Sequence, residues 1–180
     1  MSFTRWTNWA HITIGTRGSW LPGDPRGFRD HDHRVHSSGD YKNPPPIGEH
    51  AALHQFAKSI APPPLDLPSD LRSTIAEALG EKFIETGHPA RIIAVAARHA
   101  HALIRAEDDD AKPIAGRAKQ AASHAVRRSL PGTIWSQGCH VVRVCDEAHF
   151  HAIVAYIAEH EREGAAVWVH PSCRKSDLRG

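Results

Sequence analysis

The chain has 180 residues, of which 41% are apolar, and a formal net charge of +2. This size and composition predict one domain, 1–180, with its own core, and the weak charge neither requires nor excludes binding to nucleic acid. No apolar run approaches the length of a membrane span and no signal-peptide pattern opens the chain, so we expect a cytoplasmic protein that does not enter a membrane.

The first expected element is a strand at residues 9–15. Ala10, Ile12 and Ile14 alternate there with Trp9, His11 and Thr13, which is the period of a half-buried strand. Residues 17–48 are rich in Gly, Pro, Asp and His and predict a long loop excursion. A loop of that length inside a compact domain is usually functional or disordered.

Two helices are expected after this loop. The first covers residues 48–60 and ends before a run of three prolines. Three apolar residues share one of its sides: Leu53, Phe56 and Ile60. The second begins at Ser69 or Asp70, which are good N-caps, and ends at Gly87. Its apolar stripe consists of Leu71, Ile75, Leu79 and Phe83.

The rest of the chain predicts a hairpin of two strands, followed by two helices that alternate with two further strands. The hairpin strands are residues 91–97 and 99–104. After them we expect a helix over 113–130, a strand over 141–144, a helix over 147–161 capped by Asp146, a strand over 165–169 and a basic tail at 170–180. This order predicts an α+β sandwich, in which helices pack on one mainly antiparallel sheet.

Histidine is unusually common in this chain, with 15 residues, so a bare His-x-His pair carries little weight. Three such pairs occur, at 31/33, 99/101 and 149/151. Residues i and i+2 share a face on a strand but not on a helix, and only the pair at 99/101 falls on an expected strand. His99 and His101 are therefore the pair that we expect to bind one metal ion.

The expected helix at 147–161 carries a tyrosine among histidines. Tyr156 and His160 are four residues apart and share a face, and His149 lies on the same face two turns earlier. Such a set of residues could carry out a specific chemistry, in which two or three imidazoles hold a divalent cation that polarises a phosphate and a tyrosine oxygen attacks phosphorus to form a covalent link. On its own, Tyr156 also fits a boundary tyrosine with a buried ring and a hydrated hydroxyl group.

These motifs, in this order, resemble the tyrosine HUH transposases, which comprise the insertion-sequence-200-like enzymes and their repeat-associated (REP) relatives. The matching segments are His99-Ala100-His101, Trp135, Tyr156-Ile157-Ala158-Glu159-His160 and Gly164-Ala165-Ala166-Val167. The first strand and the segment Gly18-Ser19-Trp20-Leu21-Pro22-Gly23-Asp24 resemble a subset of the family.

The resemblance implies a ferredoxin-like fold and a reaction on single-stranded DNA with hairpins, which is cut and rejoined through a 5′-phosphotyrosine intermediate. It implies Tyr156 as nucleophile and His99, His101 and His160 as ligands of Mg²⁺ or Mn²⁺. His149, which shares the helix face of Tyr156, is a candidate outer partner of the site. Three positions differ from the usual family pattern: His160 replaces an amide, Arg98 replaces Asn and Glu161 replaces Pro.

Basic side chains supply most phosphate contacts in DNA-binding proteins. The candidates here are Arg17, Arg26, Lys119, Arg127, Arg128, Arg174 and Lys175. The alternative for the helix residues among them is an ordinary solvated face. The expected partner is single-stranded DNA with hairpins, the expected location is the cytoplasm and the nucleoid, and a homodimer is compatible with the sequence.

Two other functions are compatible with the same sequence. The first is a domesticated module that binds DNA hairpins without cutting them. The second is a zinc-stabilised domain with a ligand set of Cys145, His149, His170 and Cys173, although no Cys-x-x-Cys spacing supports it. Otherwise, the three cysteines, Cys139, Cys145 and Cys173, are expected to be reduced thiols.

Overall fold

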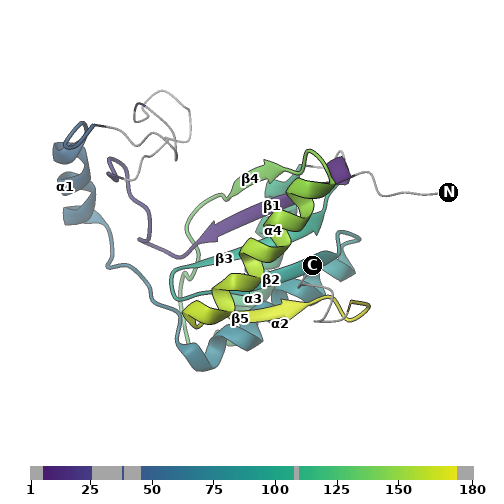
Figure 1. Cartoon of the computed structure of the whole chain (residues 1–180). Helices are drawn as coiled ribbons and strands as arrows, with labels where there is room; N and C mark the ends of the chain where they lie inside the picture. The colour runs from purple at the N-terminus through teal and green to yellow at the C-terminus, as the bar shows by residue number, and fades with distance from the viewer. Residues whose placement is uncertain (1–5, 26–37, 39–45, 108–109, 174–180) are drawn as a thin grey trace.

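The structure is a computed structural model that describes residues 6–25, 38, 46–107 and 110–173 (Figure 1). One five-stranded sheet lies at its centre, with the order β4-β1-β3-β2-β5 and antiparallel pairing between all neighbours. The strands are β1 (Trp9–Gly15), β2 (Ala90–Val95), β3 (His99–Arg105), β4 (His140–Arg143) and β5 (Ala166–Val169). Among the described residues, no helix is long and apolar enough to cross a membrane.

Four helices accompany the sheet: α1 (Ala51–Ile60), α2 (Arg72–Glu85), α3 (Ala111–Val126) and α4 (Glu147–Glu159). Short 3₁₀ turns are η1 (Trp6–Asn8), η2 (Ser69–Leu71) and η3 (His160–Glu163). The first four strands, with α2 and α3 as crossovers, form the β-α-β-β-α-β arrangement of a ferredoxin-like fold, and β5 extends the sheet beside β2. The expected fold class is therefore confirmed.

The two faces of the sheet pack against different helices. Helices α2 and α3 cover one face, and α4 crosses the other (Figure 1). In β3, Ala100, Ala102 and Ile104 belong to the core under α2 and α3, whereas Leu103 belongs to the core under α4. Because successive side chains on a strand alternate, His99 and His101 lie on the α4 face with Leu103.

Aspartate side chains mark where α3 and α4 begin. The Asp146 carboxylate accepts a hydrogen bond of 2.8 Å from the His149 amide and caps α4 as expected, and Asp110 caps α3 in the same way. The expectation that Ser69 or Asp70 caps α2 is wrong. Both residues belong to the η2 turn, which follows Pro68. Helix α2 begins at Arg72, and Leu71 at the N-cap position provides no side-chain hydrogen bond.

Helix α1 differs most from the sequence-based expectation. Its predicted apolar side faces solvent, because Phe56 is 62% exposed and Ile60 is 68% exposed, and only Ala57 is buried. The helix stands away from the sheet in Figure 1. Gly23, at a φ of 78°, packs against its first turn, where a Cβ atom would lie 2.5 Å from the His54 nitrogen. Gly23 therefore packs closely against the backbone of α1, while most of the predicted apolar side of the helix stays exposed.

Two helix glycines differ in what surrounds them and give a test of the packing of α2 on β5. A methyl group at Gly80 would lie 2.6 Å from carbons of the Trp168 ring, whereas Gly116 of α3 has no such neighbour within 4 Å. Gly80→Ala should lower the free energy of unfolding by about 1–3 kcal/mol through overpacking. Gly116→Ala should raise it by about 0.5–1 kcal/mol, since alanine favours helix. Urea denaturation measures both, and equal shifts in the two variants would contradict the packing at Gly80.

Candidate metal and nucleophile site

The strand register brings polar side chains of β1 and β3 together on the α4 face. In the antiparallel pairing of β1 with β3, Thr13 lies opposite His101 and His11 lies opposite Leu103. Side chains at these positions point to the same face as His99. The apolar residues between them point into the opposite core, which fixes this orientation.

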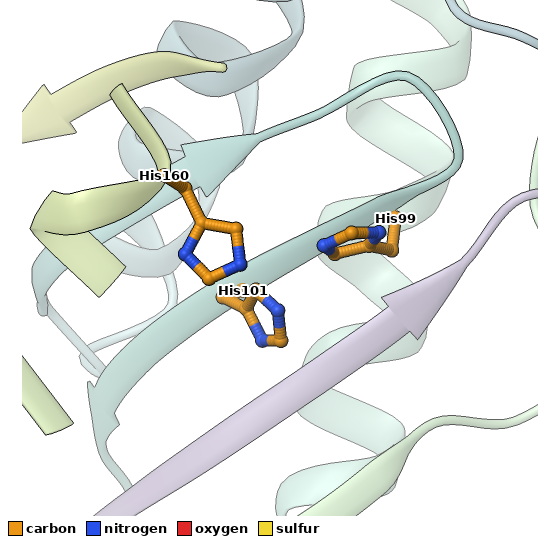
Figure 2. A group of neighbouring side chains, drawn as sticks. All are labelled: His99, His101 and His160. Atoms are coloured by element: carbon orange, nitrogen blue, oxygen red, sulfur yellow. The ribbon is translucent and has the colours of Figure 1, made fainter. Parts of the chain in front are cut away.

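Three histidines converge on this face. One ring nitrogen from each of His99, His101 and His160 lies within 4.8 Å of those of the other two, and this is the one such group of possible metal ligands in the described residues. Figure 2 shows the two β3 rings turned toward the ring of His160, which follows α4. His101 and His160 are only 5% and 8% exposed. The structure thus brings together the three residues expected to bind a metal ion.

Hydrogen bonds on the far side of two rings determine which nitrogens are free. His160 Nδ1 lies 2.9 Å from the Tyr156 carbonyl oxygen, so it must carry a proton and leave Nε2 as an acceptor. His101 Nδ1 lies 3.0 Å from His11 Nε2 and 3.2 Å from the Thr13 hydroxyl oxygen. Its Nε2 is buried and has no hydrogen-bond partner among the described residues.

This arrangement fits a divalent metal ion. A buried, unpaired ring nitrogen is unfavourable unless something binds it. An ion between the three rings would occupy His101 Nε2 and His160 Nε2, while the Nδ1 atoms keep protein partners in the usual manner of metal-bound histidine. Three imidazoles suit Mn²⁺ and later transition metals better than Mg²⁺, which prefers oxygen ligands.

The electrostatics favour neutral rings, which is the form that binds metals. Burial lowers the pKa of His101 to about 2, helped by the neighbouring His11, His99 and His160. Burial also lowers the pKa of His99, and it lowers that of His11 to about 4. These rings are therefore uncharged at neutral pH, and their lone pairs are available without loss of a proton.

Tyr156 lies over the same group of rings. Its ring centroid is 4.8 Å from that of His160, 5.2 Å from that of His101 and 6.0 Å from that of His11, and the side chain is 51% exposed. Burial of the ring, together with the Glu163 carboxylate, raises the pKa of Tyr156. The phenol group is thus close to the histidines and open to solvent, but its ionised form is disfavoured in the metal-free protein.

His149 is not one of the three converging histidines. Its Nδ1 accepts a hydrogen bond of 3.2 Å from the Cys145 amide at the start of α4. A charge on His149 contributes to the lowered pKa of His11. A role as an outer partner of the metal ligands stays a prediction.

Four of the seven predicted DNA-contacting residues lie in the part of the chain that the structure describes. Arg26, Arg174 and Lys175 lie outside the described residues. Arg127 and Arg128 are exposed at the C-terminal end of α3, which packs on the face opposite the histidines.

The other two predicted DNA-contacting residues take part in the packing of the protein itself. Lys119 donates hydrogen bonds to the carbonyl oxygens of Ser136, at 2.7 Å, and Gly138, at 2.8 Å. Arg17 is partly buried, and its backbone pairs with Ile134 and Leu65.

The alternative zinc site is not assembled. Cys145 and His149 lie beside β4, and His170 and Cys173 follow β5, so the two halves stand at opposite edges of the sheet. Five strands separate those edges by about 19 Å, which exceeds the reach of a tetrahedral zinc site. The group of possible ligands in the described residues does not include them.

Sequence reasoning missed His11, Thr13 and Glu163. The first two alternate with Ala10, Ile12 and Ile14 and were placed on one side of a strand. Only the pairing of β1 with β3 brings that side to His101. Glu163 lies in the η3 turn behind His160, and a signal for it was available in the charged run that follows the helix.

No protein-family profile matches the chain, and no curated protein matches it. A solved structure of a REP-associated tyrosine transposase bound to a REP hairpin is similar over 87% of this chain and 68% of that chain, with 13% sequence identity and a TM-score of 0.47. It comes from the family that the sequence motifs resemble.

The histidine group predicts a specific metal-binding result. Loss of an outer partner of a metal ligand weakens metal binding about 10- to 100-fold. Loss of a ligand itself should weaken Co²⁺ binding more than this in each of three variants, His99→Ala, His101→Ala and His160→Ala. Visible absorption of bound Co²⁺ measures the affinity. His151→Ala, an exposed position on α4, serves as the control and should leave it unchanged. A loss of binding in His151→Ala equal to that in the other three would contradict a site at these rings.

The environment of Tyr156 predicts its ionisation in the metal-free protein. The chain has two tyrosines, so Tyr41→Phe leaves Tyr156 as the sole phenol. Absorbance titration should place its midpoint above the value of free tyrosine, about 10. Glu163→Gln should lower this midpoint, because a carboxylate disfavours a nearby phenolate. Glu147→Gln, at the opposite end of α4, should leave it unchanged, and an unchanged midpoint in Glu163→Gln would refute the influence of that carboxylate.

Proposed function

We propose that the protein is a metal-dependent tyrosine transposase that cuts and rejoins single-stranded DNA through a 5′-phosphotyrosine intermediate. The observation that carries the proposal is the contact of Tyr156 with the rings of His101 and His160, two of three imidazoles that converge on one point. A nucleophile and a potential cation site are thereby adjacent. That combination fits phosphoryl transfer with a covalent intermediate.

Tyr156 would carry out the bond-making step. The Tyr156 oxygen attacks phosphorus, the bond from phosphorus to the 3′-oxygen breaks, and the 5′-phosphate stays on tyrosine. The phenol proton passes to solvent, which reaches the half-exposed side chain, and the leaving 3′-oxygen takes a proton from solvent. Attack by a 3′-hydroxyl group on the phosphotyrosine reverses these bond changes and rejoins DNA.

His99, His101 and His160 would hold the divalent ion, for which Mg²⁺ and Mn²⁺ are the candidates. When bound, such an ion stabilises the negative charge that develops on the phosphate oxygens. Three nitrogen ligands favour Mn²⁺ over Mg²⁺. Support for hairpin-bearing single-stranded DNA as the substrate comes from the motif resemblance of His99-Ala100-His101 and Tyr156 to the tyrosine HUH transposases.

One observation favours a second function, a module that binds DNA hairpins without cutting them. The pKa of Tyr156 is raised rather than lowered, which weakens it as a nucleophile in the metal-free state. The two functions differ in a single product. Only the enzyme forms a covalent bond between protein and DNA.

The enzyme is tested by incubation with hairpin-bearing single-stranded DNA and Mn²⁺, followed by a denaturing gel. A 5′-phosphotyrosine link predicts that a label at the 3′ end of the DNA migrates with the protein. A label at the 5′ end should appear in a shorter free strand. Tyr156→Phe should abolish both products, because phenylalanine lacks the attacking oxygen, and Tyr41→Phe should keep them.

Three outcomes would contradict parts of this proposal. An adduct that persists in Tyr156→Phe would assign the nucleophile to another residue. A 5′ label that migrates with the protein would reverse the polarity of the link. Binding of the hairpin by the metal-loaded wild-type protein with no adduct would overturn the enzyme and support the non-cutting module.

A further inference from the structure

We propose that His11 and Thr13 are positioning residues that hold a proton on His101 Nδ1 and so reserve His101 Nε2 for a divalent cation. This inference rests on the metal role of the three histidines proposed above. It concerns two residues of β1 that the sequence motifs do not include. Neither side chain belongs to the group of converging ligands.

The first support is the geometry around His101 Nδ1. His11 Nε2 lies 3.0 Å from this nitrogen and the Thr13 hydroxyl oxygen lies 3.2 Å from it, so both are within hydrogen-bond distance. Both partners come from β1, and the strand pairing fixes where they stand. The contact is therefore built into the sheet rather than made by a mobile loop.

The second support is the other nitrogen of the same ring. His101 Nε2 is buried without a hydrogen-bond partner among the described residues. In a neutral imidazole, one nitrogen carries the proton and the other carries a lone pair. A proton on Nε2 would be buried with no acceptor, whereas a proton on Nδ1 has two acceptors at hand. The Nδ1–H form of His101 is consequently favoured.

The third support is that this form is also the one that binds metal through Nε2. His160 uses the same arrangement, because its Nδ1 donates to the Tyr156 carbonyl oxygen. Two rings of the group thus keep Nδ1 occupied by a protein partner, and their Nε2 atoms remain available. Partners of this kind orient a metal-bound histidine and raise its affinity.

Two acceptors for one proton make His11 and Thr13 partly redundant. In Thr13→Val, which keeps the shape of the side chain, His11 Nε2 can still accept the proton. In His11→Phe, which keeps an aromatic ring, the Thr13 hydroxyl oxygen can still accept it. We therefore expect modest effects from each single variant and a large effect from the double variant.

The first measurement needs no variant of β1 and no DNA. Two-bond ¹H–¹⁵N correlation spectra of metal-free protein with ¹⁵N-labelled histidine distinguish a ring protonated at Nδ1 from one protonated at Nε2. The His101 signals are identified by their loss in His101→Gln. The expected result is the Nδ1–H form in wild-type protein. A predominant Nε2–H form would overturn the proposal.

The second measurement is Co²⁺ affinity by visible absorption. The double variant His11→Phe/Thr13→Val should bind Co²⁺ about 10- to 100-fold more weakly and should show a larger Nε2–H fraction at His101. The control is His124→Phe/Thr74→Val, which makes the same changes at exposed positions on helices of the opposite face and should change neither. An affinity within twofold of wild type, with an unchanged tautomer, would overturn the proposal.

Folding and function are separated in this design. If the double variant fails to fold, Thr13→Val and the wild-type spectra still decide the tautomer and its dependence on the hydroxyl group. A protein with the Nδ1–H form, strong Co²⁺ binding and no covalent DNA adduct would refute the transposase activity and leave the positioning role intact. Weak Co²⁺ binding by wild-type protein would refute the metal role and the positioning role together.

Discussion

The pairing of β1 with β3 is the constraint on which the site depends. In this register Gly15 lies opposite His99 and Thr13 lies opposite His101, and the histidines face α4. A slip of one residue would turn both imidazoles into the core under α2 and α3, which is filled by apolar side chains. Burying two unpaired imidazoles in that core is costly, so the same apolar packing that stabilises the sheet also keeps the histidines on the correct face.

The path of α4 follows from the strands that it connects. β4 and β5 form opposite edges of the sheet, so the helix between them must cross the whole face. Its 13 residues span about 20 Å, and it runs obliquely over that face (Figure 1). Its apolar stripe packs on Ile92 and Leu103, which fixes its rotation and directs Tyr156 and His160 toward the β3 histidines.

The site is prepared for a cation more completely than for proton transfer. Burial keeps His11, His99 and His101 neutral, which makes lone pairs available but means that none of these three rings carries a positive charge to stabilise a phenolate. Tyr156 is correspondingly a weak acid in the metal-free protein. A bound divalent ion would supply the missing positive charge, which is a physical reason for nucleophile and ligands to share one surface.

The sequence by itself determined the elements whose signals are local. Alternation identified β1 and β3, the choice of His99 and His101 over two other histidine pairs followed from strand geometry, and the spacing of four residues paired Tyr156 with His160. Only the tertiary structure decided that His11 and Thr13 stand behind His101, that Cys145 and His170 lie at opposite edges, and that the apolar side of α1 stays exposed. The reason is that periodicity depends on near neighbours in the chain, whereas strand register, sheet order and the surface that covers a helix depend on residues far apart in sequence.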